Sequence, residues 1–413
     1  MSALQQVQAA EVLAAPDRHA GRNTTLLLIS TLTIMAGATI SPSLPAIESH
    51  FAGSANVEIL TRLVLTLPAL SIVICAPFAG GLADRFGRRP LLIVAALLYG
   101  LGGMSGLLAN SLPGLLVGRA LLGVAVAGVM TTATALVGDY FSGPARDRFM
   151  GYQSAFVGFG GLIFLTGGGM LAELHWRAPF AVYGLSLLLI PAIIAFIDEP
   201  VRSRLSTMSV ASQVSARTAW LAVFAVYIAA VFNSVAFYLL PTQLPFHLNA
   251  MGIGSPTLAG LAIGLGNLIG AIAALAYASL RARLGVIGVF GLAFGLMATG
   301  YILLGLASSL VTVLFAAGVV GLGLGMIMPN IAAAAMAAAA PDMRGRVAGG
   351  MTASIFAGHF ISPFVSQPMI AAFGFANTYL CTGLVVGCIA VLGGAVAVLP
   401  ARTDRTKKAD FRG

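Results

Sequence analysis

Charged side chains are scarce in this sequence, and acidic ones are the scarcest. Of its 413 residues, 8% are Asp, Glu, Lys or Arg, and only 13 are acidic. Soluble domains carry about 25% charged residues. Hydrophobic residues make up 59% of the chain. This composition excludes an ordinary soluble domain and favours a chain that lies mostly in lipid.

Cysteine is also rare, and the three residues Cys75, Cys381 and Cys388 all fall inside apolar stretches. Cys381 and Cys388 share one predicted helix, where a rise of about 1.5 Å per residue separates them by about 10 Å, too far for a disulfide. The cysteines are therefore predicted to be packing residues, and no metal site is predicted.

Several functional motifs are missing from the sequence. There is no phosphate-binding loop of the Walker type and no stretch left over for a soluble catalytic domain. A selectivity-filter sequence or rings of charge, which are typical of channels, are missing as well. These absences argue against an enzyme, an ATP-driven pump, a channel and a bound cofactor.

The sequence does contain a series of apolar segments long enough to span a membrane. A bilayer core about 30 Å thick needs about 20 apolar residues in a helix. Fifty glycines suit close contact between such helices, because small residues let backbones approach. The predicted fold is an all-α membrane protein with twelve transmembrane helices at 24–46, 57–79, 90–109, 113–137, 149–171, 178–197, 218–240, 257–279, 286–306, 310–333, 347–371 and 376–399.

Positive charge lies on one side of these segments. If the N-terminus is inside, 19 of the 22 Lys and Arg residues fall on the inner side, and only Arg62, Arg119 and Arg177 do not. The positive-inside rule then places both termini in the cytoplasm. Because the basic residues are scattered over many loops, the net charge of +9 indicates contact with anionic membrane lipids rather than with nucleic acid.

The two halves of the sequence repeat at a constant offset of 198 residues. Matching pairs are Gly87 and Gly285, Gly123 and Gly321, Arg146 and Arg344, Arg148 and Arg346, and Gly151 and Gly349. Two six-helix, pseudo-symmetric halves in one orientation, with a site between them, are typical of transporters. The predicted organisation is a cytoplasmic tail at 1–23, a first half at 24–197, a cytoplasmic linker at 198–217, a second half at 218–399 and a cytoplasmic tail at 400–413.

A loop rich in Gly and Arg joins the second and third segments, with the sequence Gly80-Gly81-Leu82-Ala83-Asp84-Arg85-Phe86-Gly87-Arg88-Arg89-Pro90. Its glycines permit a tight turn, and its arginines can pair with carboxylates or lipid phosphates. The loop resembles the signature loop of the major facilitator superfamily, and helix count and repeat extend the resemblance over the whole chain. The resemblance implies a multi-pass transporter of a bacterial-type cytoplasmic (inner) membrane that functions as a monomer.

The resemblance also implies a latch that closes the cytoplasmic side. In the family, the loop Asp and Arg act together with an acid at the inner end of the fourth helix. Asp84 would face the start of the eleventh helix near Val347. The alternative is that these charges only set the topology. Carried over, the latch residues are Gly80, Asp84, Arg85, Gly87, Arg88, Arg89 and Asp139.

Within the superfamily, the chain most resembles the drug/proton antiporters with twelve helices. Two stretches carry this likeness, Ser41-Pro42-Ser43-Leu44-Pro45-Ala46-Ile47 and Arg119-Ala120-Leu121-Leu122-Gly123. The fifth segment has the glycine spacing of that group's antiporter motif in Gly151, Gly160 and Gly168-Gly169, but Phe164-Leu165 stands where the motif has Gly-Pro. The likeness implies proton-coupled efflux, as in multidrug resistance, and the departure leaves import open.

Ionisable side chains inside membrane segments are costly and are candidates for function. Arg119 lies about 9 Å into its helix and is predicted to act in the cavity or in coupling; alternatively it pairs with backbone carbonyls. Arg62 is a second coupling candidate, although Glu58 four residues earlier makes a favourable helical pair with it. His359 can cycle a proton or remain neutral and hydrogen-bonded.

No Asp or Glu falls in the middle of a segment. A desolvated cationic substrate would need such a partner, so an anionic, zwitterionic or neutral amphipathic substrate is favoured. Each candidate lining residue has helix packing as its alternative role. The provisional substrate cavity is lined by Met35, Thr39, Phe156, Phe164, Asn233, Phe237, Tyr238, Asn267, Asn330 and Gln367.

The function predicted from these features is a secondary active transporter. We expect proton-coupled export of amphipathic small molecules by rocker-switch alternating access, with the proton gradient as the energy source. The alternative is an importer or facilitator of an organic anion or zwitterionic metabolite.

Overall fold

The chain folds into helices throughout the part that the computed structural model describes, residues 3–200, 219–340 and 343–409. Those residues contain no strand, which confirms the predicted all-α class. Short 3-10 turns η1 (Ser41–Ser43), η2 (Ser105–Leu107) and η3 (Ala178–Gly184) interrupt the helices. The helices are α1 (Ala3–Ala38), α2 (Leu44–His50), α3 (Val57–Phe86), α4 (Arg88–Met104), α5 (Leu112–Tyr140), α6 (Gly143–Leu174), α7 (Leu185–Phe196), α8 (Trp220–Ala250), α9 (Pro256–Gly305), α10 (Leu310–Ala338) and α11 (Arg344–Ala409).

Two of these helices each contain two membrane crossings. Among the described residues, ten helical stretches are long and apolar enough to cross a membrane, and those in α9 and α11 run for 50 and 48 residues. One crossing needs about 20 residues. α9 bends at Gly285 (φ 67°) and α11 at Gly374 (φ 77°), a conformation that glycine adopts readily. Divided there, the ten stretches give the twelve predicted crossings.

The helix ends differ from the predicted segment ends. α1 begins at Ala3, inside the predicted tail 1–23, because its first turns are rich in Ala and other good helix formers. α11 likewise continues to Ala409, past the predicted tail start at 400. Apolar runs locate a crossing, whereas helix propensity decides how far the helix continues beyond it. Apart from residues 198–200, the predicted linker 198–217 lies outside the described residues.

The repeat appears as matched contacts inside the two halves, α1–α7 and α8–α11. A Cβ added at Gly123 would lie 2.5 Å from the carbonyl oxygen of Pro68. A Cβ added at Gly321 would lie 2.1 Å from the carbonyl oxygen of Gly266. Both the glycines and their partners are related by the same offset of 198. The close helix contacts predicted from the glycine content are therefore made in equivalent places.

The same offset relates the starts of α5 and α10. Ser111 Oγ accepts a hydrogen bond from the backbone N–H of Gly114 at 3.2 Å, and Ser309 Oγ accepts one from Thr312 at 3.3 Å. Serine at this position satisfies one of the N–H groups that a helix start leaves without a partner. The two halves thus share helix starts as well as helix packing.

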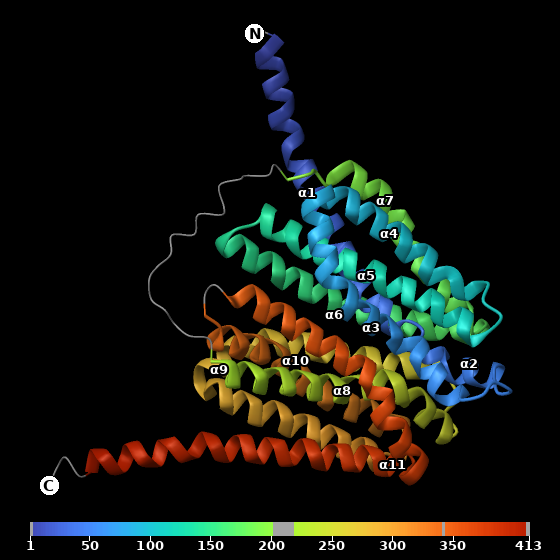
Figure 1. The fold of residues 1–413 in the computed structure, drawn as a ribbon, viewed down its shortest axis with the longest axis vertical. Helices are drawn as coiled ribbons and strands as arrows, with labels where there is room; N and C mark the ends of the chain where they lie inside the picture. Colours follow the sequence, from blue (N-terminus) through green and yellow to red (C-terminus); the bar gives the residue numbers. More distant parts are fainter. Residues whose placement is uncertain (1–2, 201–218, 341–342, 410–413) are drawn as a thin grey trace.

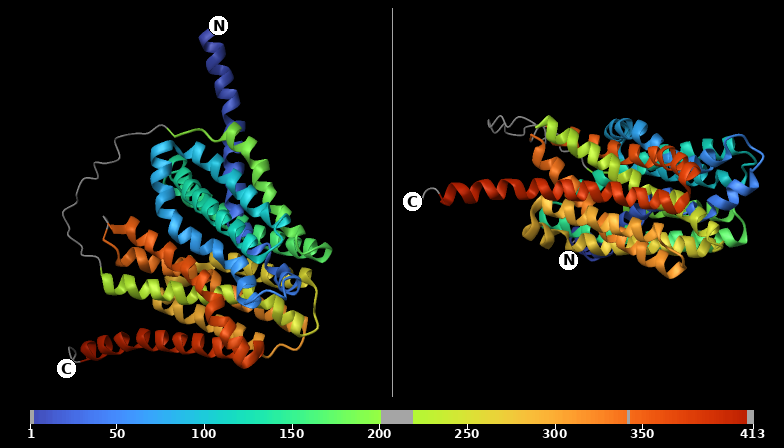
Figure 2. Two further views of the ribbon diagram at one scale, coloured as in Figure 1. Left: turned by 45° about the vertical axis from the view of Figure 1, so that its right-hand side comes forward. Right: turned by 90° about the horizontal axis from the view of Figure 1, so that it is seen from below.

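The two halves lie side by side (Figures 1 and 2). Each packs mostly around a hydrophobic core of its own, and a few side chains such as Tyr238 and Leu165 pack into the core of the other half. The helix ends define two faces of this bundle. We call the end that contains Gly87, Asp139 and Glu199 the linker face, and the opposite end, which contains α2 and Glu58, the α2 face. In Figure 1 the linker face lies to the left and α2 to the right.

Candidate functional site

A cavity of about 740 Å³ lies between the two halves. Its walls come from α1, α5 and α6 in the first half and from α8, α9 and α10 in the second. The lining reaches Met150 and Gly151, about two turns from the start of α6 at the linker face. The cavity therefore occupies the linker-face side of the molecule.

The described lining of this cavity carries no Asp, Glu, Lys, Arg or His. Its polar groups are hydroxyls and amides, among them Ser30, Thr33, Gln153 and Asn267. Gln153 Nε2 donates to Ser30 Oγ at 2.6 Å and so ties α6 to α1. A mostly apolar wall with a few hydroxyls and amides suits an uncharged or amphipathic small molecule.

A smaller chamber of about 190 Å³ adjoins the cavity. It shares Thr33 and Asn267 with the cavity and adds an aromatic wall that includes Tyr238, Phe356 and His359. The His359 ring stacks on Tyr238, with ring centroids 4.1 Å apart and 21° between the ring planes. The Nε2 atom of His359 is buried and has no hydrogen-bond partner among the described residues. The chamber thus combines flat apolar surfaces with an unsatisfied polar atom.

Glycines on α6 and α9 bring the halves together at the α2 face. A Cβ at Gly169 would lie 2.4 Å from the carbonyl oxygen of Pro256, and one at Gly260 would lie 2.1 Å from that of Leu165. Backbones approach this closely only where side chains are missing. These contacts join the halves on the side away from the cavity.

The change Gly260→Ala should push α6 and α9 apart. Because the new Cβ would meet a backbone oxygen at 2.1 Å, the helices must separate, at a cost of about 1–3 kcal/mol. We expect a lower melting temperature of the purified protein. Gly295→Ala on the same helix is the matched control, since nothing lies within 4 Å of that Cβ position. Equal melting temperatures for the two variants would contradict this account.

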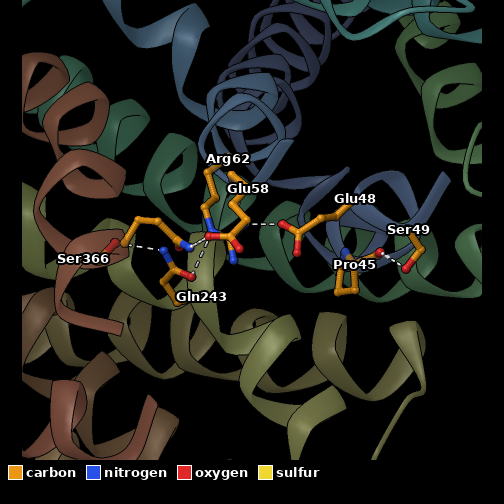
Figure 3. Close-up of polar contacts among 8 residues, drawn as sticks. Pro45, Glu48, Ser49, Glu58, Arg62, Gln243 and Ser366 are labelled. Carbon is orange, nitrogen blue, oxygen red and sulfur yellow. Dashed lines mark hydrogen bonds and ion pairs between the residues drawn. The ribbon is translucent and has the colours of Figure 1, made fainter. Parts of the chain in front are cut away.

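Arg62 connects the two halves at the α2 face (Figure 3). Its side chain is 3% exposed and forms an ion pair with Glu48 in the first half. Its Nε donates to Gln243 Oε1 in the second half at 3.2 Å, and Gln243 Nε2 donates to Ser366 Oγ at 2.9 Å. The guanidinium also lies 3.9 Å from the centre of the Phe246 ring. One buried cation therefore bonds to both halves.

Two acidic side chains make further contacts across the α2 face. Gln367 Nε2 donates to Glu58 Oε2 at 2.6 Å, and Ser255 Oγ donates to Glu173 Oε1 at 2.7 Å. The predicted pair of Glu58 with Arg62 is made through the backbone, because Arg62 Nη1 donates to the carbonyl oxygen of Glu58 at 2.7 Å. The Glu58 carboxylate is thereby available to Gln367 in the other half.

A hydroxyl of the first half completes the backbone bonding of α8. Ser41 Oγ donates to the carbonyl oxygen of Pro241. That carbonyl has no helical donor, because the residue one turn later is Pro245, which lacks an N–H group. The proline in α8 thus creates an acceptor that the other half satisfies.

Glu199 holds the loop between α3 and α4 at the linker face. Its carboxylate accepts hydrogen bonds from the backbone N–H groups of Arg88 at 2.7 Å and Arg89 at 2.8 Å. An acid at a helix N-terminus is favourable, and Gly87 (φ 99°) provides the turn into α4. Arg88 also forms an ion pair with Asp139 at the end of α5. Glu199 lies at the start of the predicted linker 198–217, and no sequence pattern predicted these contacts.

The other predicted latch residues lie at the same face. Gly80, Asp84 and Arg85 occupy the last two turns of α3. Val347, the expected partner region, is buried in the second half, where its carbonyl oxygen accepts a hydrogen bond from Tyr227 at 3.0 Å. A latch between Asp84 and α11 stays a prediction for the state in which the linker face is closed.

Arg119 is 1% exposed and lies outside the cavity lining. Its Nε donates to the carbonyl oxygen of Val64 at 2.7 Å, and its Nη2 donates to that of Ala36 at 2.6 Å. The helical donor for Val64 would be Pro68, which has no N–H group. Ala36 lies in the last turn of α1, where carbonyls lack helical donors. Arg119 therefore pairs with backbone carbonyls, as in the alternative prediction, and does not line the described cavity, while its role in coupling stays a prediction.

Three of the predicted cavity residues line the cavity or its chamber, namely Phe237, Tyr238 and Asn267, together with the coupling candidate His359. The remaining predicted cavity residues lie outside both linings: Met35, Thr39, Phe156, Phe164, Asn233, Asn330 and Gln367.

Most of these excluded side chains serve contacts within or between helices. Thr39 Oγ1 donates to the carbonyl oxygen of Met35 at 2.8 Å, and Asn330 Nδ2 donates to that of Val286 at 2.9 Å. Conversely, sequence reasoning missed Ser30 and Gln153. Which side of a helix faces the cavity depends on how the halves pack, and an all-round apolar helix gives no signal of it.

This chain is similar to known proteins over most of its length. The family model of the Major Facilitator Superfamily matches residues 26–363 and 252–412. Multidrug resistance protein 1 of Bacillus subtilis is 28% identical over 189 residues, which are 44% of this chain and 47% of that protein. The niacin transporter NiaP of Acinetobacter baylyi is 29% identical over 139 residues, 33% of this chain and 32% of that protein. Each of these matches spans less than half the length of the relative.

The fold also matches solved structures. A bacterial homologue of the human lysosomal transporter Spinster, in an inward-facing and unoccupied conformation, superimposes with a TM-score of 0.73. The match covers 94% of this chain and 98% of that one, at 18% identity. At this identity the likeness shows a shared fold.

Proposed function

Because this chain belongs to the major facilitator superfamily, we propose that it is a proton-coupled exporter of amphipathic small molecules. The cavity between the halves carries this proposal. Its volume of about 740 Å³ suits a drug-sized ligand, and its described lining has hydroxyls and amides but no charge. The similarity to a protein named for multidrug resistance supports export of this class of compound.

We place the linker face in the cytoplasm of a cell with a bacterial-type inner membrane. In this orientation 19 of the 22 Lys and Arg residues lie on the cytoplasmic side, as the positive-inside rule requires. The cavity then serves the cytoplasm, and the contacts of Arg62 and Gly260 close the outside. This arrangement corresponds to an inward-facing transporter ready to take up cargo.

Transport then follows from rocking of the two halves about the cavity. The contacts at the α2 face, from Arg62 to Gln243 and from Glu58 to Gln367, break as the outside opens. The linker face closes at the same time, and the loop from Asp84 to Arg89 approaches the start of α11. Both sets of contacts are polar and small, so the two states can exchange.

The proton is assigned to His359. Among the described lining residues of the cavity and chamber, it is the one whose side chain ordinarily changes charge near neutral pH. Arg119 is a poorer candidate, because its guanidinium stays charged and two of its donors are held by carbonyls.

A liposome assay tests the proposal. Purified protein would be reconstituted with the pH dye pyranine inside, and neutral, cationic and anionic amphipaths would be added in turn. We expect neutral amphipaths to cause proton movement in the wild-type protein and little in His359→Phe. If no amphipath moves protons, and an imposed pH gradient drives none of them, proton-coupled export is wrong.

The second candidate is uptake of an organic anion or zwitterionic metabolite. One relative is named a niacin transporter, which favours this reading. The absence of Arg and Lys from the described cavity lining weighs against it, because a desolvated carboxylate needs a cationic partner. Accumulation of labelled nicotinate in cells that express the protein would favour uptake, whereas reduced retention of an amphipathic dye would favour export.

A further inference from the structure

We propose that the chamber at His359 binds an uncharged aromatic group that carries a hydroxyl. This inference rests on the proposed transport function and specifies the ligand class for its innermost site. Three properties of the chamber lead to this inference. Its walls are aromatic, one buried polar atom has no hydrogen-bond partner, and its described lining contains no Asp, Glu, Lys or Arg.

The walls of the chamber fit a flat ring. Three aromatic side chains surround His359, with ring centroids 4.1 Å away for Tyr238, 5.4 Å for Phe356 and 5.7 Å for Phe237. The volume is about 190 Å³. An apolar cavity of about 150 Å³ is enough to hold benzene. One aromatic ring of a ligand therefore fits the chamber, while the rest of the molecule extends into the adjoining cavity.

The unsatisfied atom is Nε2 of His359. The residue is 9% exposed, and this nitrogen is buried with no partner in the described part of the chain. Leaving a buried polar atom unpaired is costly, so a ligand group that pairs with it gains affinity. A neutral imidazole nitrogen either donates or accepts, depending on the tautomer, and a hydroxyl can do both. A hydroxyl on the ring thus satisfies His359 in either tautomer.

The surroundings of the chamber disfavour a charged ring. Tyr238 and His359 are the titratable residues of its described lining, so neither a carboxylate for a cation nor an arginine for an anion is present. The Arg119 guanidinium lies outside the described lining, where Nε and Nη2 donate to the carbonyl oxygens of Val64 and Ala36 and Nη1 has no described partner. An uncharged hydroxyl-bearing ring meets all three conditions.

Paired probes of equal size test the inference. The dissociation constants of 2-naphthol and 2-methylnaphthalene would be measured for the detergent-purified full chain, with 2-naphthoate as the anionic probe. Each dissociation constant would be corrected for partition of the probe into protein-free micelles of the same detergent. After this correction, we expect the wild-type protein to prefer 2-naphthol over 2-methylnaphthalene by about tenfold or more.

Two variants locate the preference. His359→Phe keeps an aromatic ring but removes the polar atom, so the preference should vanish while 2-methylnaphthalene binds as before. His247→Phe is the matched control, because His247 also has a buried Nε2 without a described partner but lines neither the cavity nor the chamber. That variant should keep the preference.

Several results would overturn the inference: equal affinity of the wild-type protein for the two neutral probes, a preference that survives in His359→Phe, or tighter binding of 2-naphthoate. Any of these, found while neutral amphipaths still move protons in liposomes, would reject the chamber as the hydroxyl site and leave the proposed transport intact. Failure of transport itself would appear in the liposome assay, which does not depend on these probes.

Discussion

The variant Arg62→Met is expected to open the α2 face. The protein should then favour the state in which the cavity opens at the α2 face and the linker face is closed. The substitution keeps an apolar side chain of similar length but removes the ion pair with Glu48 and the bond to Gln243. Of the contacts that are lost, the charge-assisted hydrogen bond to Gln243 and the contact with the Phe246 ring join the two halves. A hydrogen bond to a charged group is worth about 1.5–3 kcal/mol, so we expect about 2 kcal/mol, or roughly a thirtyfold change in the ratio of the two states.

Spin labels can measure this change directly. One pair, at Ala52 and Ala250, spans the two halves at the α2 face, and a second pair, at Gly138 and Arg283, spans them at the linker face. All four positions are exposed. In a background without the native cysteines, Arg62→Met should lengthen the first distance and shorten the second, with loss of transport and little loss of folded protein.

Two companion variants separate the charge from the geometry. Arg62→Lys keeps the positive charge but lacks the planar fork that contacts Glu48 and Gln243 together, so it should open the face partially. Gln243→Leu removes the bond to Arg62 across the halves, together with the bond to Ser366 inside the second half, and should also open the face partially. Unchanged distances in Arg62→Met would mean that the other contacts of the α2 face, among them the glycine contacts of α6 and α9, hold the outside closed without Arg62.

The crossings were predictable from sequence because lipid imposes a strong condition on composition. A helix must stay apolar for about 20 residues to cross, and that signal is local. Gly285 and Gly374, which divide the two longest helices, fall in the short gaps predicted between segments. The helix ends were less predictable, as Ala3 and Ala409 show, because no such condition applies outside the membrane.

The candidate site was predictable only in part, since it depends on how helices face one another. Phe237, Tyr238 and His359 were found because polar and aromatic residues stand out in apolar helices. Gln367 stands out in the same way, yet it bonds to Glu58 at the α2 face rather than lining the cavity. The partners of Arg62 and Glu199 come from distant parts of the chain, and no local sequence pattern predicts these contacts.

The variant Arg119→Ala is expected to lower the stability of the protein rather than to uncouple its transport. The carbonyl of Val64 would lose its Arg119 donor, and the carbonyl of Ala36 would keep only the long bond from the Tyr183 hydroxyl at 3.5 Å. A hydrogen bond between membrane helices is worth about 0.6–1.7 kcal/mol, and charge-assisted bonds are roughly twice as strong, so the two bonds together contribute about 2–7 kcal/mol. Unfolding in SDS followed by tryptophan fluorescence would measure the loss. Arg119→Lys, which keeps a donor, should lose less.

A double-mutant cycle with Pro68 decides between the two roles of Arg119. If Arg119 serves the carbonyl that Pro68 leaves without a donor, then Pro68→Ala restores an N–H group to α3 and should make the loss of Arg119 less costly, by about 1–3 kcal/mol. Pro77→Ala is the matched control. Pro77 is the second proline inside α3, and the carbonyl that it leaves without a donor one turn earlier is not contacted by Arg119. In the Pro77→Ala background, the stability changes of the two substitutions should simply add. The opposite result would be an Arg119→Ala variant that keeps wild-type stability but loses transport, with additive effects in both cycles. Arg119 would then be a coupling residue that acts from outside the cavity.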